Sequence, residues 1–334
     1  MDNLTHTLAG VAISQAGLNR KTRFATLTLV LAANIPDVDI VSGFRGSLTY
    51  LKYHRGISHS FVGITVLALV LWGVVSGLGR KARPKPNLPL SGRWLFLAAL
   101  LGTGSHLLLD YTTAYGVRPF LPFSGRWYAW DIMPIIDPLL LIILIAGLGV
   151  PWLLRLVSEE VGVQKSRWAL GAIFCLGAMV ALWGIRDFAH RRALAFLDSR
   201  TYSGEVPQRL GAFPVAVNPF TWTGVAETDT SFHVLPENVL DPSGQSEEMG
   251  RFVKPSMSPP LAAAMKTRGG EIFLDFARFP WAQVTESGDG YKVSIEDLRF
   301  FRFPTRSRSF IFETELDKDL RPLSEAFYFA APGR

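Results

Sequence analysis

Cysteine is almost absent from this 334-residue chain, which contains a single one, Cys175, inside an apolar stretch. No disulfide framework can therefore form within the chain. The sequence also has no Gly-x-Ser-x-Gly elbow and no glycine-rich phosphate-binding loop, which argues against a serine hydrolase of that type and against a nucleotide-binding protein. Its first residues lack a basic segment, so we expect no cleaved signal peptide.

Charged residues are also few, at 19% of the chain, and their net charge is +6. A positive balance can indicate a nucleic-acid partner. Here the basic residues gather in short loops between apolar blocks, which is the pattern of a membrane protein. We therefore expect no nucleic-acid partner and a membrane-lipid environment instead.

Long apolar blocks occur only in the first 186 residues or so. Blocks 57–78, 94–109 with its flanks, and 132–154 have about the 17–25 residues that a membrane-spanning helix needs, and block 168–185 is just long enough. Shorter helices at 4–17 and 24–35 could form a hairpin that crosses partly, or could be lengthened by their flanks. The fold predicted for residues 1–190 is an all-α, multi-pass transmembrane helical bundle.

After about residue 200 the hydrophobic period changes. Segments 271–284, 291–301 and 309–315 alternate or are rich in β-branched and aromatic residues, and the turn sequence Ser287-Gly288-Asp289-Gly290 separates the first two. This pattern predicts antiparallel strands, with a short helix at 261–266. We expect residues 191–334 to form a small soluble β-rich (α+β) domain.

The most informative stretch is Tyr53-His54-Arg55-Gly56-Ile57-Ser58-His59-Ser60, at the mouth of the apolar block that starts near residue 57. Imidazole is the commonest protein ligand for metals and acts as an acid or base near neutral pH. Two imidazoles beside an arginine at a membrane surface are difficult to explain by packing. Arg55 could clamp an anionic group such as phosphate with its planar donors.

Other histidines and aspartates lie at helix ends in a regular order. They fall at the starts of the first and fifth predicted helices and at the ends of the second and fourth, as His54 and His59 fall at the start of the third. Antiparallel neighbours bring all these ends to one side of the membrane, and ionisable groups there are functional by default. In chain order the residues are Asp2, His6, Asp37, Asp39, His106, Asp110, Asp131 and Asp137.

Basic residues predict which side this is, because short basic loops mark the cytoplasmic face. The polar clusters should then lie on the periplasmic or extracellular side, together with the C-terminal domain. The bias is moderate, since several basic residues also lie on the polar side. The opposite side receives Arg20, Lys21, Arg23, Arg80, Lys81, Arg83, Lys85, Arg93, Arg155, Lys165 and Arg167.

The pairs Asp2-x3-His6 and His106-x3-Asp110 each place a carboxylate and an imidazole on one helix face. Mixed ligands of this kind suit zinc, and also manganese or iron, and their number allows one ion, two, or more. Each residue also has a simpler explanation. His6 alone is an even choice between ligand and interfacial residue, Asp2 fits a helix N-cap, and Asp131 and Asp137 fit caps or supporting residues slightly better than ligands.

The combination of motifs resembles the YdjM-like family of bacterial inner-membrane, LexA-regulated metal-dependent hydrolases. The resemblance covers roughly residues 1–150. The arrangement of the motifs is also similar, by analogy only, to that of zinc-dependent phospholipase C enzymes. The family resemblance implies a divalent metal site with ligands from His6, Asp37, His54, His59, His106 and Asp110. The matching elements are Met1-Asp2-x-x-Thr5-His6, Asn34-x-Pro36-Asp37-x-Asp39, His54-Arg55-Gly56-x-Ser58-His59-Ser60, His106-x3-Asp110 and Trp130-Asp131-x5-Asp137-Pro138.

These observations together predict a hydrolase of the plasma (inner) membrane that uses a metal-activated water on a phosphoester such as a phospholipid or a lipid-linked phosphate. Arg55, Asp39 and Asp131 are the candidates for catalytic roles beside the metal ligands. Two alternatives stay open. One is a non-enzymatic metal-binding or transport protein, and the other is a scaffold with a structural metal and a partner-binding β-domain.

Overall fold

The computed structural model describes residues 1–82, 88–160, 168–241, 250–301 and 309–330. The chain forms two compact units: Met1–Asp39 with Arg55–Arg186, which we call the membrane unit, and Ile40–His54 with Asp187–Arg334, which we call the β unit. The predicted fold class, a transmembrane helical bundle followed by a β-rich domain, is confirmed. Four of the basic residues used to predict orientation, Arg83, Lys85, Lys165 and Arg167, lie outside the described residues.

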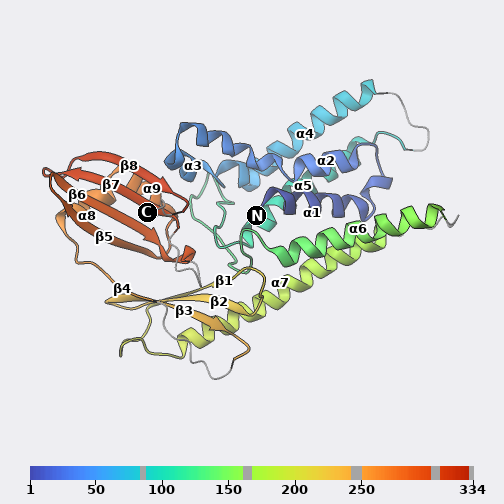
Figure 1. The fold of residues 1–334 in the computed structure, drawn as a ribbon. Coiled ribbons are helices and arrows are strands. Elements are labelled where there is room, and N and C mark those ends of the chain that lie inside the picture. The colour runs from blue at the N-terminus through green and yellow to red at the C-terminus, as the bar shows by residue number, and fades with distance from the viewer. Residues whose placement is uncertain (83–87, 161–167, 242–249, 302–308, 331–334) are drawn as a thin grey trace. The chain divides into compact units, whose positions relative to one another are not determined.

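Up to residue 198 the regular elements of the described chain are helices (Figure 1). Among the described residues, four stretches are long and apolar enough to cross a membrane: Ala25–Arg45, Phe61–Lys81, Gly92–Tyr111 and Ala169–Asp198. The short second predicted helix thus reaches spanning length through the 3-10 helix that follows it. The elements are α1 (Asn3–Gln15), η1 (Leu18–Arg20), α2 (Ala25–Ala32), η2 (Ile35–Arg45), α3 (Ser47–Tyr53), η3 (Ile57–His59), α4 (Phe61–Lys81), α5 (Gly92–Tyr111), α6 (Pro138–Glu160) and α7 (Trp168–Asp198).

Two predicted helix starts were wrong. The helix predicted from residue 57 begins at Phe61, because Ser60 caps it by accepting the backbone N–H of Gly63. The helix predicted from residue 132 begins at Pro138, where Asp137 accepts the N–H of Leu140 at 2.9 Å. A proline in the first helical position lacks only a donor that would be unpaired there. Asp137 is therefore a helix cap, one of the two explanations considered for it.

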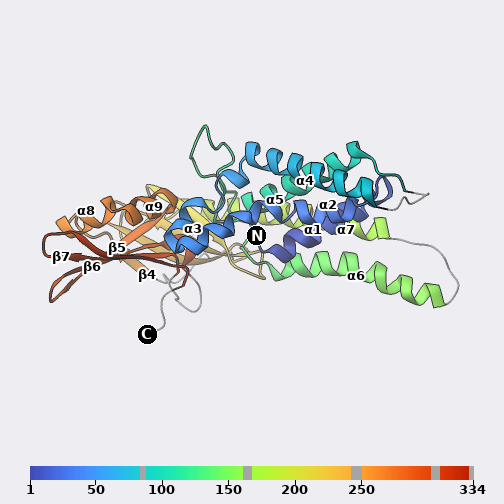
Figure 2. The same ribbon diagram turned by 90° about the horizontal axis from the view of Figure 1, so that it is seen from above.

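Small residues allow α2 and α5 to lie unusually close in the membrane unit. A Cβ added at Gly102 would lie 2.4 Å from the Cβ of Ala32 and 3.0 Å from the carbonyl oxygen of Leu29. Glycine permits such backbone approach between membrane helices. Helices α4 and α5 also run along each other (Figure 2). The consequence for function is that the end of α2 is fixed against the C-terminal half of α5.

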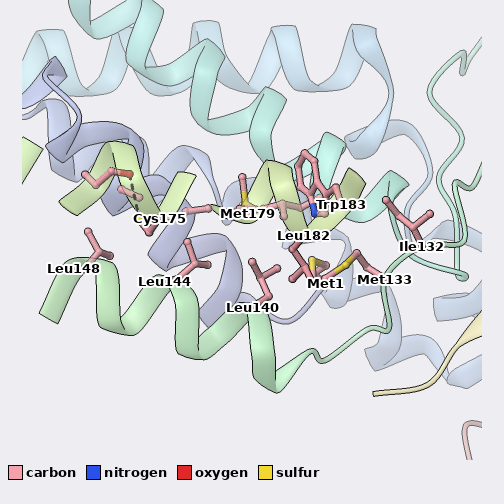
Figure 3. Close-up of a cluster of buried hydrophobic side chains, with 14 residues drawn as sticks. Met1, Ile132, Met133, Leu140, Leu144, Leu148, Cys175, Met179, Leu182 and Trp183 are labelled. Atoms are coloured by element: carbon pink, nitrogen blue, oxygen red, sulfur yellow. Dashed lines mark hydrogen bonds between the residues drawn. The ribbon is translucent and has the colours of Figure 1, made fainter. Parts of the chain in front are cut away.

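A hydrophobic cluster joins α6 to α7 in the same unit (Figure 3). Leu140, Leu144 and Leu148 follow one face of α6 at helical spacing, and α7 presents Cys175 and Met179 toward them. The lone cysteine is fully buried here and serves as a small apolar side chain.

The β unit contains two four-stranded antiparallel sheets, each with its strands in chain order. The C-terminal part of α7 packs on the first sheet through Ala189, Ala193 and Leu197. Helices α8 (Pro259–Lys266) and α9 (Arg268–Phe276) pack on the second sheet. The first sheet consists of β1 (Arg209–Pro214), β2 (Thr221–Glu227), β3 (Ser231–Asn238) and β4 (Gly250–Val253), and the second of β5 (Pro280–Ser287), β6 (Gly290–Asp297), β7 (Ile311–Asp317) and β8 (Pro322–Tyr328), with η4 (Leu298–Phe300) between β6 and β7.

The predicted strand at 271–284 was partly wrong, because its first half is helix α9. Thr267 caps this helix by accepting the N–H of Gly270, and Phe273 and Phe276 lie three residues apart on its buried face. Segment 40–54 stands between the two parts of the membrane unit in the chain. It contains α3 and belongs to the β unit, where α3 packs against α9 and β8.

Candidate metal centre

Four side chains from three separate parts of the membrane unit meet at one point. Asp37 comes from η2, His59 from η3, and His106 and Asp110 from successive turns of α5. One potential ligand atom from each lies within 4.8 Å of all the others. Three of the side chains are almost fully buried, and the side chain of Asp37 is 17% exposed. These four residues, which we call the metal centre, were all predicted ligands.

The distances between the potential ligand atoms fit one ion. The Nε2 atoms of His59 and His106 are 3.0 Å apart, and Asp110 Oδ2 lies 3.2 Å from the first and 3.3 Å from the second. Asp37 Oδ1 lies 3.4 Å from His59 Nε2 and 3.5 Å from His106 Nε2. Ligands placed tetrahedrally at zinc bond lengths of about 2.0–2.1 Å are about 3.3–3.4 Å apart.

Hydrogen bonds on the far sides of both imidazole rings favour metal binding. His106 Nδ1 lies 2.7 Å from the carbonyl oxygen of Ala33, which can only accept, so this nitrogen carries the proton. His59 Nδ1 lies 3.3 Å from Asp39 Oδ2. Such partners fix the tautomer of a ligating histidine. Both Nε2 lone pairs then face each other, an arrangement that requires a cation, either a proton or a metal, between them.

Asp110 has one oxygen turned toward the imidazoles and one toward cations of the protein. Oδ2 is buried and makes no hydrogen bond within the described residues. Oδ1 is 2.8 Å from Arg55 Nη2 and also accepts from the terminal amine of Met1. A buried carboxylate oxygen without a hydrogen bond is costly, and a metal ion at the centre of the four residues would satisfy it.

Arg55 is buried under the site, where it can position Asp110. Its side chain is bonded to Asp110 and to the hydroxyl of Thr113 at 2.8 Å, and its guanidinium lies 4.7 Å from the ring centre of Tyr115. Its backbone has a φ of 54°, a left-handed conformation that a non-glycine residue adopts at some cost. Within the described residues, Nε is its one buried side-chain nitrogen without a hydrogen bond.

Asp39 supports the histidine from outside the set of four. Its Oδ2 accepts the backbone N–H of Arg55 at 2.9 Å and the hydroxyl of Ser58 at 3.1 Å, besides facing His59 Nδ1. These contacts place its carboxylate behind the His59 ring. Burial disfavours the charged form of His59, but the carboxylates of Asp110, Asp37 and Asp39 around its ring outweigh it and raise the pKa of His59 to about 10.

His6 lies at the edge of the metal centre. Its ring stacks on His106 with 3.9 Å between the ring centres, and its Nε2 is 3.4 Å from Asp110 Oδ1. Both of its nitrogens are buried and make no hydrogen bond within the described residues. Arg55 already faces the same Asp110 oxygen, so a second ion beside His6 would meet a fixed positive charge.

The remaining predicted site residues are not among the four residues of the metal centre. His54 belongs to the β unit, where its ring stacks on Tyr50 with 4.5 Å between ring centres. Asp131 has a backbone φ of 61°. The residue after it, Ile132, donates its N–H to the carbonyl of Thr112. Asp2 caps α1 by accepting the N–H of Thr5, which is the simpler explanation considered for it in the sequence. The contacts of Ala33, Thr113 and Tyr115 were not predicted, because a carbonyl or a lone hydroxyl carries no sequence signal.

The helices and the four converging side chains define a multi-pass membrane protein with a centre that could hold a metal ion. The chain belongs to the YdjM inner membrane protein family, whose sequence profile matches residues 1–191. It is also similar to the uncharacterized protein YfhP of Bacillus subtilis (strain 168), at 26% identity over 159 residues, which is 45% of this chain and 46% of that protein. The match thus spans less than half of that relative. No solved structure matches the chain.

Proposed function

We propose that this protein is a membrane-embedded, metal-dependent hydrolase that acts on a phosphoester such as a phospholipid or another lipid-linked phosphate. The observation that supports this most is the set of four ligand atoms within 4.8 Å of one another, in which each carboxylate lies 3.2–3.5 Å from both imidazole nitrogens. Such a set suits zinc first, and manganese or iron next. When bound, the ion would polarise a phosphoryl oxygen and lower the pKa of a water molecule.

The roles of the protein side chains follow from their contacts. Asp37, His59, His106 and Asp110 would hold the ion. Arg55 pairs with Asp110 Oδ1 and aims this carboxylate at the centre, and Asp39 orients His59, so both act as positioning residues. Clamping of a phosphate by Arg55 would begin from Nε, the guanidinium nitrogen that makes no hydrogen bond within the described residues. The catalytic role of Asp131 stays a prediction, as does ligation by His6 and His54.

The exposed part of Asp37 gives the centre a side from which a substrate could approach. A lipid is the substrate class that fits a site at the ends of membrane helices, because lipid headgroups lie at that depth. The external orientation of the centre and of the β unit remains part of the proposal and rests on the distribution of basic residues.

One observation favours a second candidate function, a scaffold with a structural metal. Four protein ligands fill a tetrahedral zinc site, whereas catalytic zinc commonly keeps one position open. The two functions differ in what Asp37 does. In a hydrolase it would leave or share its position when substrate arrives, and in a scaffold it would stay bound.

The first experiment is metal analysis of the purified full chain beside His59→Ala and Asp110→Ala. His233→Ala is the matched control, because His233 is equally buried but lies in the β unit. We expect metal in the wild type and the control and its loss in the two site variants. Equal metal content in all four proteins would contradict metal binding by these four residues.

The second experiment screens phospholipids and generic phosphodiesters for turnover, with and without chelator. Turnover that chelator abolishes and zinc restores would support the hydrolase. Metal binding without turnover on any substrate would favour the scaffold.

A further inference from the structure

A groove of about 380 Å³ lies on the β unit, lined by Ile40, Gly43, Ser47, Tyr50 and Phe329. It is a shallow groove that is open to solvent along most of its surface. One wall comes from η2 and α3, and the other from the residue that follows β8. The ring of Tyr50 meets the ring of Phe329 edge to face at 5.6 Å. The hydroxyls of Ser47 and Tyr50 are the only polar side-chain groups among these five residues.

The groove residue Ile40 and two apolar residues near it in the chain are open to solvent. Phe44 is 93% exposed, Ile40 63% and Val41 57%. Exposed apolar residues in sequence mark an interaction site or a membrane contact. These three belong to Ala25–Arg45, a stretch apolar enough to lie in a membrane. Hydrocarbon is therefore the medium that this part of the chain suits, which favours a lipid over a protein as the occupant.

Charge supports the same occupant. Arg45 lies between the groove residues Gly43 and Ser47 in the chain, Lys52 follows Tyr50 by two residues, and both cations are exposed. An anionic headgroup is the ligand that such cations attract.

We propose that this groove holds a hydrocarbon chain of an anionic lipid. All five groove residues belong to the β unit, so this lipid binding is a property of that unit alone and goes beyond the proposed function.

The test is photolabelling of the full-length protein in detergent with a single-chain phospholipid that carries a diazirine near the end of its acyl chain. Gly43→Leu fills the groove at modest cost, since a Cβ there would meet only Tyr50, at 3.5 Å. Gly288→Leu is the matched control, because its Cβ would meet nothing within 4 Å and it lies in the turn between β5 and β6. Phe329→Ala is a second variant, which removes one wall of the groove.

We expect labelled peptides from residues 40–50 and around Phe329 in the wild type and in Gly288→Leu. Excess unlabelled lipid should suppress this labelling, and Gly43→Leu and Phe329→Ala should reduce it to the suppressed level. Thermal unfolding and size-exclusion profiles like those of the wild type would show that both variants fold. Equal labelling in Gly43→Leu and Gly288→Leu, or labelling that unlabelled lipid does not suppress, would overturn the groove.

The experiments test the proposed hydrolysis and the lipid binding in the groove separately. Labelling is expected to persist in Asp110→Ala, because that residue is not part of the groove. Specific labelling without turnover would support lipid binding and overturn hydrolysis.

Discussion

Asp39 accepts the backbone N–H of Arg55 at 2.9 Å, and these two residues mark where the chain leaves the membrane unit and where it returns. The fifteen residues between them, 40–54, belong to the β unit. Asp37 lies just before this excursion and His59 just after it. Segment 40–54 of the β unit is therefore preceded and followed, within a few residues of the chain, by two of the four residues of the metal centre.

The first prediction concerns Asp39→Ala. This change removes one acceptor that serves the N–H of Arg55, the hydroxyl of Ser58 and the ring of His59. Loss of such a supporting carboxylate typically weakens metal binding by about 10–100-fold. Zinc affinity measured by competition with a chromogenic chelator checks this. Asp289→Ala, in an exposed turn of the β unit, should bind zinc as the wild type does, and so would Asp39→Ala if the residue had no supporting role.

A second prediction tests the connection through segment 40–54. Leu51 of α3 and Leu316 of β7 are both 1% exposed, and both lie in the β unit. Each change to alanine should lower stability by about 2–5 kcal/mol. Only Leu51→Ala should also weaken zinc binding, because it loosens the segment that ends at Asp39 and Arg55. Chelator competition and thermal unfolding on both variants give the comparison, and equal zinc affinity in the two would contradict the connection.

The sequence allowed the four residues of the metal centre to be predicted because each lies next to a recognisable helix end. Membrane topology then places alternate ends on one side, which brings distant residues together without any knowledge of packing. The position of segment 40–54 in the β unit could not be found this way. It depends on contacts of α3 with α9 and β8, elements far away in the chain, and hydrophobic periodicity carries no information about such pairing.

Helix α9 shows a second limit. Residues 271–276 contain Ile272, Phe273 and Phe276, types that favour strands as well as buried helix faces. The cap at Thr267 decides for helix locally, and the sheet that α9 covers supplies the rest. Likewise, Arg55 was predicted to face a substrate, since its sequence neighbours are histidines. Its contacts with Asp110, Thr113 and Tyr115 depend on a long-range approach that the sequence does not show.

The third prediction uses the close approach of α2 and α5. A Cβ at Gly102 would clash with Ala32, whereas one at Gly104 meets nothing within 4 Å. Gly102→Ala should push the helices apart, at about 1–3 kcal/mol, and separate His106 from the carbonyl of Ala33 and from Asp37. We expect weaker zinc binding in Gly102→Ala and wild-type binding in Gly104→Ala. The same affinity in both would show that this contact does not set the metal centre.

The fourth prediction is a pH dependence of metal binding. Ligating histidines must be deprotonated, so protons compete with the metal. Because the pKa of His59 is raised to about 10, its ring holds a proton at neutral pH that the metal must displace. Zinc affinity should then rise by about tenfold per pH unit between about pH 6 and 8. Affinities from chelator competition, corrected for protonation of the chelator, test this, and a flat profile would contradict it.

The last prediction concerns a buried ion pair that holds α6 to α7. Arg186 Nη2 lies 2.6 Å from Asp137 Oδ2, and both side chains are fully buried. Arg186→Met would leave the Asp137 carboxylate buried without its partner, which costs about 3–5 kcal/mol. The double variant Asp137→Ser with Arg186→Met keeps a cap for Leu140 and removes both charges, so it should be more stable than the single variant.

Arg191 provides the matched control for this pair. It forms an ion pair of 2.8 Å with Asp187 on the same helix, but its side chain is 76% exposed. Arg191→Met should change stability by only about 0–1 kcal/mol, because solvent screens the interaction. Thermal unfolding of the purified proteins in detergent gives the order. If Arg186→Met unfolds no earlier than Arg191→Met, the buried pair does not stabilise the bundle, and the cap on α6 alone fixes where that helix begins.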